Sequence, residues 1–132
     1  MKKTGLLHAE LSRVIASMGH GDVLVIGDAG LPVPPGVQLI DLALREGVPG
    51  FVETLEIVLT ELHVERAVID EEMASVSPAM SAAFHAAWPG DIALHSVPHA
   101  ELQETAKAAK ALVRTGECTP YSNIVLVAGV IF

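Results

Sequence analysis

The sequence of 132 residues has few basic side chains, few aromatic residues and a single cysteine. Eight Lys and Arg stand against sixteen Asp and Glu, so the formal net charge is −8, and the basic residues are scattered along the chain. Nucleic-acid binding requires clustered cations to neutralise phosphates, so this composition argues against a nucleic-acid partner. The lone Cys118 excludes an intramolecular disulfide and is typical of the reducing cytoplasm.

Long apolar runs are also missing. The longest spans residues 124–132, nine residues, whereas a membrane-spanning helix needs roughly 20, so we expect no membrane segment. Lys2 and Lys3 precede no apolar stretch of the length found in secretory signals, and we expect none here. Phosphate-binding loops, the GxGxxG dinucleotide motif and the GxSxG elbow of serine hydrolases are absent from the sequence. The histidines show no metal-ligand spacing, so we expect no metal site.

What the chain does contain is a high apolar fraction, 51%, made mainly of Ala, Val, Leu and Ile. This fraction excludes a disordered chain. Combined with the few charged residues, 18%, it indicates that some apolar surface is covered in an oligomer.

Apolar periodicity predicts helices alternating with strands in one domain, residues 1–132. Leu11, Val14, Ile15 and Met18 form one face of the first helix, and Gly19 is expected to be its left-handed C-cap. Ser77 as N-cap and Pro78 as first helical residue indicate the start of a helix. Gly116 is expected to stop the helix that begins at Pro98. The predicted helices are 8–18, 50–62, 77–88 and 98–114, and the predicted strands are 22–26, 37–42, 64–69, 92–97 and 124–132. This order favours a three-layer α/β/α sandwich with a mostly parallel or mixed central sheet.

Candidate site residues are ranked by position, because open α/β sheets bind ligands at the carboxyl ends of their strands. Asp28 follows a strand in a Gly-rich loop, and His20 lies between Gly19 and Gly21. Each also has an ordinary structural interpretation: Asp28 as an Asx-turn residue and His20 as part of a solvated turn. The Glu71–Glu72 pair is interpreted as a solvated edge, because neighbours on an extended chain point to opposite faces.

Two further candidates lie at the start of late elements. Tyr121, Ser122 and Asn123 precede the last strand, and His99 opens the late helix. Their structural interpretations are a core tyrosine with a satisfied hydroxyl and an exposed histidine. Imidazole, carboxylate, phenol and amide groups together suit proton transfer on, and hydrogen bonding to, a small polyhydroxylated molecule.

Four segments carry a resemblance to a known family: MGHGD (18–22), GDAGLPVP (27–34), RTGECTPYSN (114–123) and NIVLVAGVIF (123–132). Together they resemble the D-ribose pyranase family of RbsD-type sugar mutarotases, and the likeness extends over nearly the whole chain except about residues 72–92. The resemblance implies a cytoplasmic isomerase that interconverts β-D-ribopyranose and β-D-ribofuranose without a cofactor. It also implies a pentamer or decamer with sites at subunit interfaces.

The resemblance also implies roles for individual residues. His20 matches the histidine that donates the proton in this family. The family's sugar-binding residues match Asp28, His99, Tyr121, Ser122 and Asn123, with Ser122 acting through its backbone.

Other functions remain open at this point. An L-fucose mutarotase shares MGHGD but typically reads DAHFP where this chain has residues 28–32, DAGLP. A non-catalytic, transport-associated sugar-binding subunit would bind without accelerating exchange. A flavodoxin-like nucleotide module is disfavoured by the missing phosphate loop and the net charge.

Overall fold

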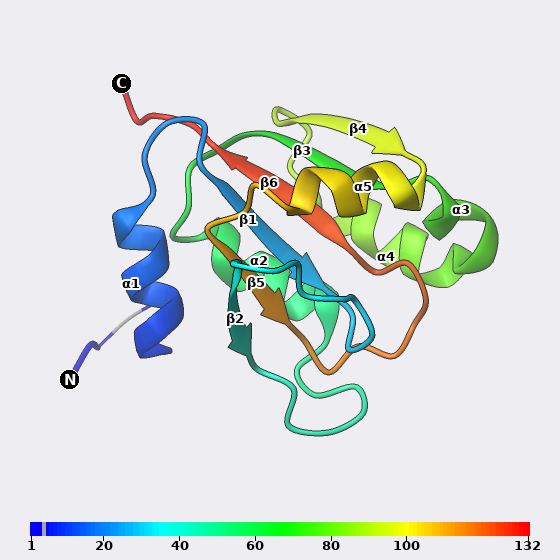
Figure 1. Cartoon of the computed structure of the whole chain (residues 1–132), viewed down its shortest axis with the longest axis horizontal. Coiled ribbons are helices and arrows are strands. Elements are labelled where there is room, and N and C mark those ends of the chain that lie inside the picture. Colours follow the sequence, from blue (N-terminus) through cyan, green and yellow to red (C-terminus); the bar gives the residue numbers. More distant parts are fainter. Residues whose placement is uncertain (4) are drawn as a thin grey trace.

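The computed structural model describes residues 1–3 and 5–132 and has a mixed sheet between helices (Figure 1). Within these residues the elements are α1 (Ala9–Ser17), β1 (Val23–Gly27), β2 (Gln38–Asp41), α2 (Phe51–Leu59), β3 (Val64–Asp70), α3 (Glu72–Val76), α4 (Pro78–Ala87), β4 (Ala93–Val97), α5 (His99–Ala106), β5 (Ala111–Arg114) and β6 (Ile124–Ala128).

The order of strands in the sheet decides where the loops meet. The six described strands lie in the order β2-β5-β1-β6-β3-β4. Pairing is parallel between β2 and β5, β5 and β1, and β3 and β4, whereas β6 runs antiparallel to both β1 and β3. The carboxyl ends of β1, β3, β4 and β5 therefore lie at one edge of the sheet, together with the start of β6.

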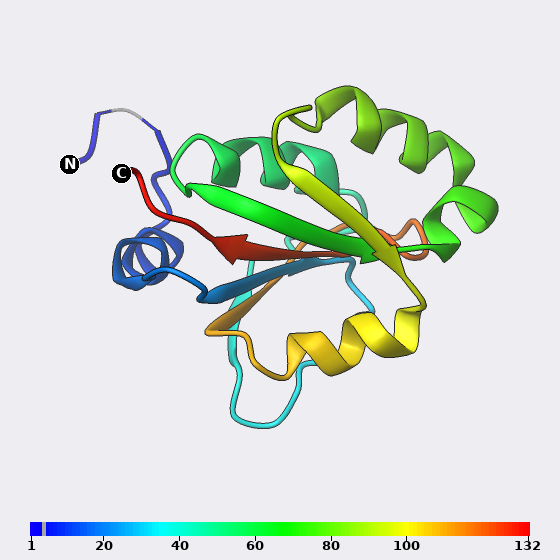
Figure 2. The same ribbon diagram turned by 90° about the horizontal axis from the view of Figure 1, so that it is seen from above.

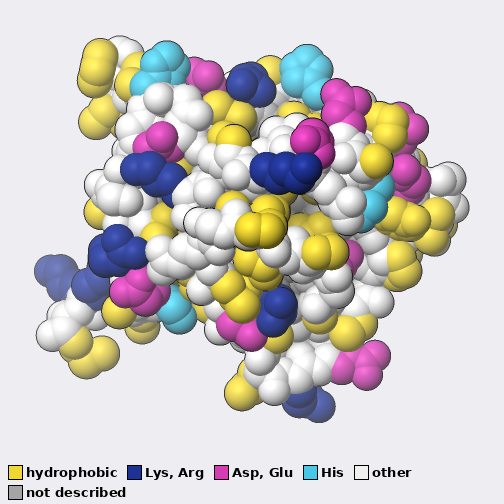
Figure 3. Space-filling model, viewed as in Figure 1, with side chains coloured by type: hydrophobic (Ala, Val, Ile, Leu, Met, Phe, Trp, Pro, Cys, Tyr) yellow, Lys and Arg dark blue, Asp and Glu magenta, His cyan; other side chains and the backbone are white. Residues whose placement is uncertain are grey.

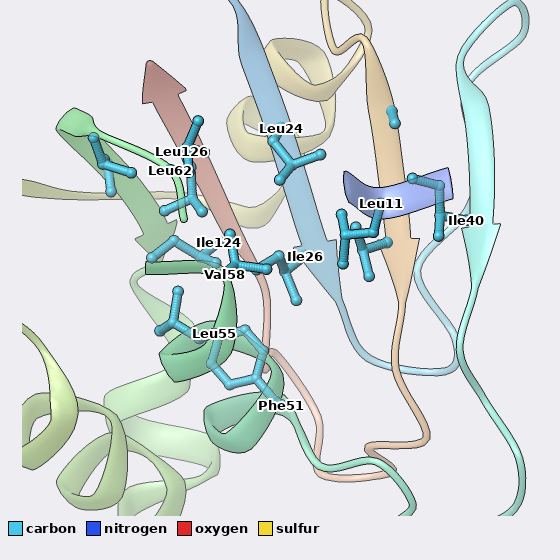
Figure 4. Close-up of a cluster of buried hydrophobic side chains, with 14 of the residues drawn as sticks. Leu11, Leu24, Ile26, Ile40, Phe51, Leu55, Val58, Leu62, Ile124 and Leu126 are labelled. Carbon is cyan, nitrogen blue, oxygen red and sulfur yellow. The ribbon is translucent and has the colours of Figure 1, made fainter. Parts of the chain in front are cut away.

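Helices cover both faces of the sheet, which confirms the predicted α/β sandwich with a mixed sheet. Figure 2 shows α2 and α4 on one side and α5 on the other. On the α2 side, Phe51 and Leu55 point toward Ile26 and Ile124 of the sheet (Figure 4), and all four are fully buried. Burial of such a side chain contributes about 1.5–3 kcal/mol, so this layer anchors β1 and β6 side by side.

The predicted helix 98–114 is wrong in its second half. α5 ends at Ala106, and Ala111–Arg114 is a strand between β2 and β1. Ala111, Leu112 and Val113 have no exposed surface, because both of their faces are covered in the middle of the sheet. Burial of three consecutive apolar residues outweighs the helix propensity of an Ala-rich stretch, since propensity differences amount to less than about 1 kcal/mol per residue.

One expected helix cap is wrong, and a second has the expected position without the expected hydrogen bond. Gly19 is not a left-handed cap: Met18 caps α1 in an extended conformation, and the positive φ of 82° occurs at Gly21. Ser77 occupies the N-cap position and Pro78 opens α4, which confirms the predicted helix start. The Ser77 hydroxyl makes no capping hydrogen bond, because it donates to the carbonyl of Pro120 at 2.7 Å.

The stretch after β3 is helical rather than extended. Glu71 flanks α3 and Glu72 lies within it. The Glu72 carboxylate accepts from His99 N at 3.1 Å, so it stabilises the start of α5 instead of lying on a solvated edge.

Basic side chains are dispersed over the α5 face of the molecule. Figure 3 shows Lys and Arg side chains at several separate places on this face, a few of them next to one another at the left and others next to acidic side chains. Among the described residues, every helix is too short to span a bilayer.

Candidate functional site

A cavity of about 440 Å³ opens at the edge of the sheet where the carboxyl ends of the parallel strands meet. Its volume falls in the range of small-molecule sites, about 300–1,000 Å³. Loops after β1, β4 and β5 supply its walls. The lining residues are Asp28, Ala29, Gly30, Leu31, Pro32, His99, Glu117, Cys118, Thr119, Pro120, Tyr121 and Asn123.

Asp28 is held in place by its own loop and by Asn123. Its Oδ1 accepts from Gly30 N at 3.0 Å, which is an Asx turn, and its backbone N–H donates to Asn123 Oδ1 at 3.0 Å. Burial raises the pKa of the Asp28 carboxyl above its ordinary value. Asp28 therefore forms the turn expected of a structural residue and also borders the cavity.

His99 and Asn123 share one buried carboxylate, Asp70, at the end of β3. Asp70 Oδ1 lies 2.9 Å from His99 Nδ1, and Asp70 Oδ2 accepts from Asn123 Nδ2 at 2.7 Å. The second ring nitrogen of His99, Nε2, lies 3.0 Å from Gln103 Nε2. Sequence reasoning missed Asp70, although it lies at the carboxyl end of a strand, the same position that identified Asp28.

Tyr121 packs against His99 in an edge-to-face contact with ring centroids 5.3 Å apart. It is the one non-glycine residue with positive φ, 62°, among the described residues. Such a conformation costs about 1–3 kcal/mol and persists only where the surroundings enforce it. Its neighbour Ser122 is buried and its hydroxyl donates to the carbonyl of Thr119 at 2.8 Å, so this side chain stabilises the turn and does not face the cavity.

Glu117 lines the cavity, and sequence reasoning missed it as well. Its Oε1 accepts from Phe51 N at 3.1 Å and its Oε2 accepts from Thr119 Oγ1 at 2.8 Å. The carboxylate thus joins the start of α2 to the loop after β5. Because its main partner is 66 positions away in sequence, no local pattern signals this role.

His20 lies away from the other predicted site residues within one protomer. It precedes β1, whereas Asp28 follows it, and the length of that strand separates them by roughly 13 Å or more. His20 Nε2 is 2.9 Å from Glu65 Oε2, and its side chain is 62% exposed. The structure therefore brings Asp28, His99, Tyr121 and Asn123 together and leaves His20 at the opposite edge of the sheet.

The cavity combines acceptors, donors and apolar walls suited to a polyhydroxylated ligand. Carboxylate, imidazole, phenol and amide groups converge on it, and Leu31, Pro32 and Pro120 offer surfaces for C–H groups. Within the described part of the chain, no group of three or more His, Cys, Asp or Glu has the geometry of a metal site.

Comparisons with known proteins agree with this picture over the full length of the chain. The model of the RbsD / FucU transport protein family matches residues 1–131. A protein of Pseudomonas entomophila named D-ribose pyranase is 55% identical, with all of both chains covered. The structure of Bacillus subtilis RbsD complexed with D-ribose superposes with a TM-score of 0.95 at 39% identity and covers both chains completely. FucU of Bifidobacterium longum superposes with a TM-score of 0.79 at 26% identity, covering 96% of this chain and 97% of its own.

Proposed function

The chain belongs to the RbsD / FucU transport protein family, and from this membership and the cavity at the sheet edge we propose that it is a D-ribose pyranase. It interconverts β-D-ribopyranose and β-D-ribofuranose. The observation that carries the proposal is the convergence of Asp28, His99, Tyr121 and Asn123 on one cavity, in a fold that superposes on RbsD complexed with D-ribose.

The reaction needs only proton transfers. The ring oxygen of the sugar gains a proton while the anomeric hydroxyl loses one, which opens the ring to the aldehyde. Reclosure through O4 forms the furanose, and reclosure through O5 forms the pyranose. One positioned acid–base group accelerates such a step typically 10²–10⁴-fold. This chemistry requires no cofactor, and we propose that none is used.

His20 is the proposed acid, and a neighbouring copy of the chain supplies it. Its exposed side chain between two glycines lies at the edge opposite the cavity, so it is available to another protomer. Ile131 and Phe132, 89% and 101% exposed, border the same depression of about 260 Å³ as His20. Burial of such apolar side chains favours contact with a second copy. This supports a ring assembly, a pentamer or decamer, with sites shared between protomers.

Within the cavity, Asp28, His99, Tyr121 and Asn123 bind the sugar hydroxyls, so that only selected ring closures fit. Ser122 contributes through its backbone, because its side chain is occupied by Thr119. We propose a cytoplasmic location, because a single cysteine, Cys118, is typical of a reducing compartment and free ribose is metabolised there.

The first experiment measures ring exchange of D-ribose by saturation-transfer NMR. We expect His20→Ala to reduce the catalysed rate about 10²–10⁴-fold while ribose binding persists. His85→Ala, which alters an exposed histidine on α4, is the matched control and should exchange at the wild-type rate. An unchanged rate in His20→Ala would remove His20 from the mechanism.

A mixing experiment tests whether the site is shared. His20→Ala and Asp28→Asn chains are co-expressed, so that some sites combine the intact Asp28 of one copy with the intact His20 of the other. Random assembly should restore up to about a quarter of the wild-type rate, although each variant alone is inactive. No recovery in mixed assemblies would contradict a shared site.

Measuring L-fucose anomer exchange in parallel separates the ribose enzyme from a fucose mutarotase. Sugar binding without any acceleration of exchange would indicate a non-catalytic subunit.

A further inference from the structure

Asp70 is the most completely buried carboxylate at the sheet edge, yet it does not line the cavity. Its side chain has no exposed surface, and it lies directly behind two cavity residues. A buried carboxylate is costly unless hydrogen bonds compensate it. Both of its oxygens have such a partner: Oδ1 faces His99 Nδ1 at 2.9 Å and Oδ2 accepts from Asn123 Nδ2 at 2.7 Å.

The partners of the His99 ring determine where its proton lies. An ionised carboxylate only accepts, so the proton between Asp70 and His99 belongs on Nδ1. On the other side, the Gln103 amide has its Nε2 atom toward the ring, and because an amide nitrogen only donates, this orientation pairs with a lone pair on His99 Nε2. The two contacts agree on one neutral tautomer, with a hydrogen on Nδ1 and a lone pair on Nε2.

The same carboxylate fixes the amide orientation of Asn123. Because Asn123 Nδ2 is used by Asp70, Oδ1 is free to accept from Asp28 N at 3.0 Å. A flipped amide would bring two donors together at Asp28 N and two acceptors together at Asp70. Asp70 thus connects the loop after β4 with the loop after β1 through Asn123.

We propose that Asp70 is a positioning residue for the sugar site: it holds His99 as the Nδ1-H tautomer, and it fixes the Asn123 amide against the Asp28 loop. The lone pair of His99 Nε2, which accepts from Gln103 in the free protein, then accepts from a sugar hydroxyl that replaces the Gln103 amide. The role in sugar binding rests on the proposed function, whereas the tautomer does not. Burial raises the pKa of Asp70, and the hydrogen bonds from Asn123 and His99 oppose this rise.

The tautomer is measured directly from the ¹⁵N chemical shifts of the His99 ring, assigned by comparison with His99→Gln. In the wild-type protein we expect protonated Nδ1 and unprotonated Nε2. An Nε2-H ring in the wild type overturns the proposal without any variant of Asp70, so this result does not depend on whether a substitution folds.

In Asp70→Asn, position 70 has one acceptor oxygen for two donors, Asn123 Nδ2 and His99 Nδ1. If the carbonyl at position 70 accepts from Asn123, the NH₂ group at position 70 faces His99 Nδ1, and the proton of the ring moves to Nε2. We expect a mixture of tautomers and at least a tenfold rise in KM for ribose exchange, with kcat per folded site little changed. A merely structural role would lower the active fraction, which reduces the apparent kcat and leaves both KM and the tautomer unchanged.

The double variant Asp70→Asn/Asn123→Asp should restore the tautomer. The carboxylate that this variant introduces at position 123 accepts from the new amide and from Asp28 N, which frees the carbonyl at position 70 for His99 Nδ1-H. Gln103→Ala, with Asp70 intact, is the control and should keep the proton on Nδ1. Persistence of the Nδ1-H ring in Asp70→Asn together with an unchanged KM would refute the proposal. If instead wild-type protein fails to accelerate ribose exchange, the proposed function fails and the tautomer result still stands.

Discussion

Replacing Gly116 by alanine should destabilise the fold, because no room exists for a side chain at this position. A Cβ there would lie 2.6 Å from Val48 N and closer still to the carbonyl oxygens of Arg45 and Val48. These are backbone atoms, which cannot rotate away as a flexible side chain would. Gly116 O also accepts from Gly47 N at 2.7 Å, and Gly116 N donates to Pro49 O at 2.8 Å, so the two segments cannot separate without losing these bonds.

Overpacking of this kind costs about 1–3 kcal/mol. With an unfolding entropy of about 2.1 cal/mol/K per residue, this corresponds to a decrease in Tm of about 4 to 11 °C for a chain of 132 residues. Movement of the 45–50 segment also shifts the start of α2, where Glu117 accepts from Phe51 N, so we expect weaker ribose binding.

The assay is thermal and urea unfolding at one fixed protein concentration, because association shifts apparent stability. Gly90→Ala is the matched control: a Cβ at Gly90 meets no atom within 4 Å, and that glycine has no positive φ. It should change the free energy of unfolding by no more than about 1 kcal/mol and favour the folded state. Equal stability of the Gly116 and Gly90 variants would refute the steric argument.

Two further predictions concern pH and packing. Because burial raises the pKa of Asp28 above 3.8, the folded chain holds this proton more tightly than the unfolded chain. The free energy of unfolding of the wild type, relative to that of Asp28→Asn, should therefore fall as the pH rises from about 3.8 through the raised pKa of Asp28. Urea unfolding across this pH range measures it. An increase in the relative free energy of unfolding with pH would contradict the prediction. Phe84 is fully buried, with its ring centroid 5.6 Å from Trp88 and 6.2 Å from Phe51. Phe84→Ala should cost about 3–5 kcal/mol in urea unfolding, whereas Leu44→Ala, at an 81% exposed position, should stay within about 0.5 kcal/mol.

The fold was largely predictable where burial produces a simple pattern. Runs such as residues 23–26 are apolar on both faces and correspond to a central strand, β1. β5 was not predictable in the same way, because its apolar residues follow an Ala-rich helix and are as compatible with a last helical turn. Only its place between β2 and β1 makes the extended form favourable.

The candidate site was predictable to the extent that it lies next to strand ends. Asp28 follows from the general rule for open sheets. His99, Tyr121 and Asn123 were candidates because they open late elements, and their sugar-binding roles came from the resemblance. Their convergence on one cavity depends on the strand order, which periodicity does not encode.

The roles of Asp70 and Glu117 could not be predicted, although the strand-end position of Asp70 could have marked it as a candidate. Asp70 and Glu117 act through partners that are 53 and 66 positions away, so only the folded chain reveals these roles. His20 shows the opposite case: it was predicted from the sequence together with the other site residues, but within one protomer it lies far from them.

The antiparallel strand β6 has a consequence for how the molecule is made. It lies between β1 and β3, and among the described strands it alone links the group β2-β5-β1 to the pair β3-β4 within the sheet. All of these strands precede it in the chain, so both groups of strands are synthesised before the strand that joins them. Asp28 belongs to one group and Asp70 to the other. Joining them requires contacts between distant parts of the chain, which are slow to form. The cavity at this end of the sheet is therefore complete only after residues 124–128 have been synthesised and have paired with β1 and β3.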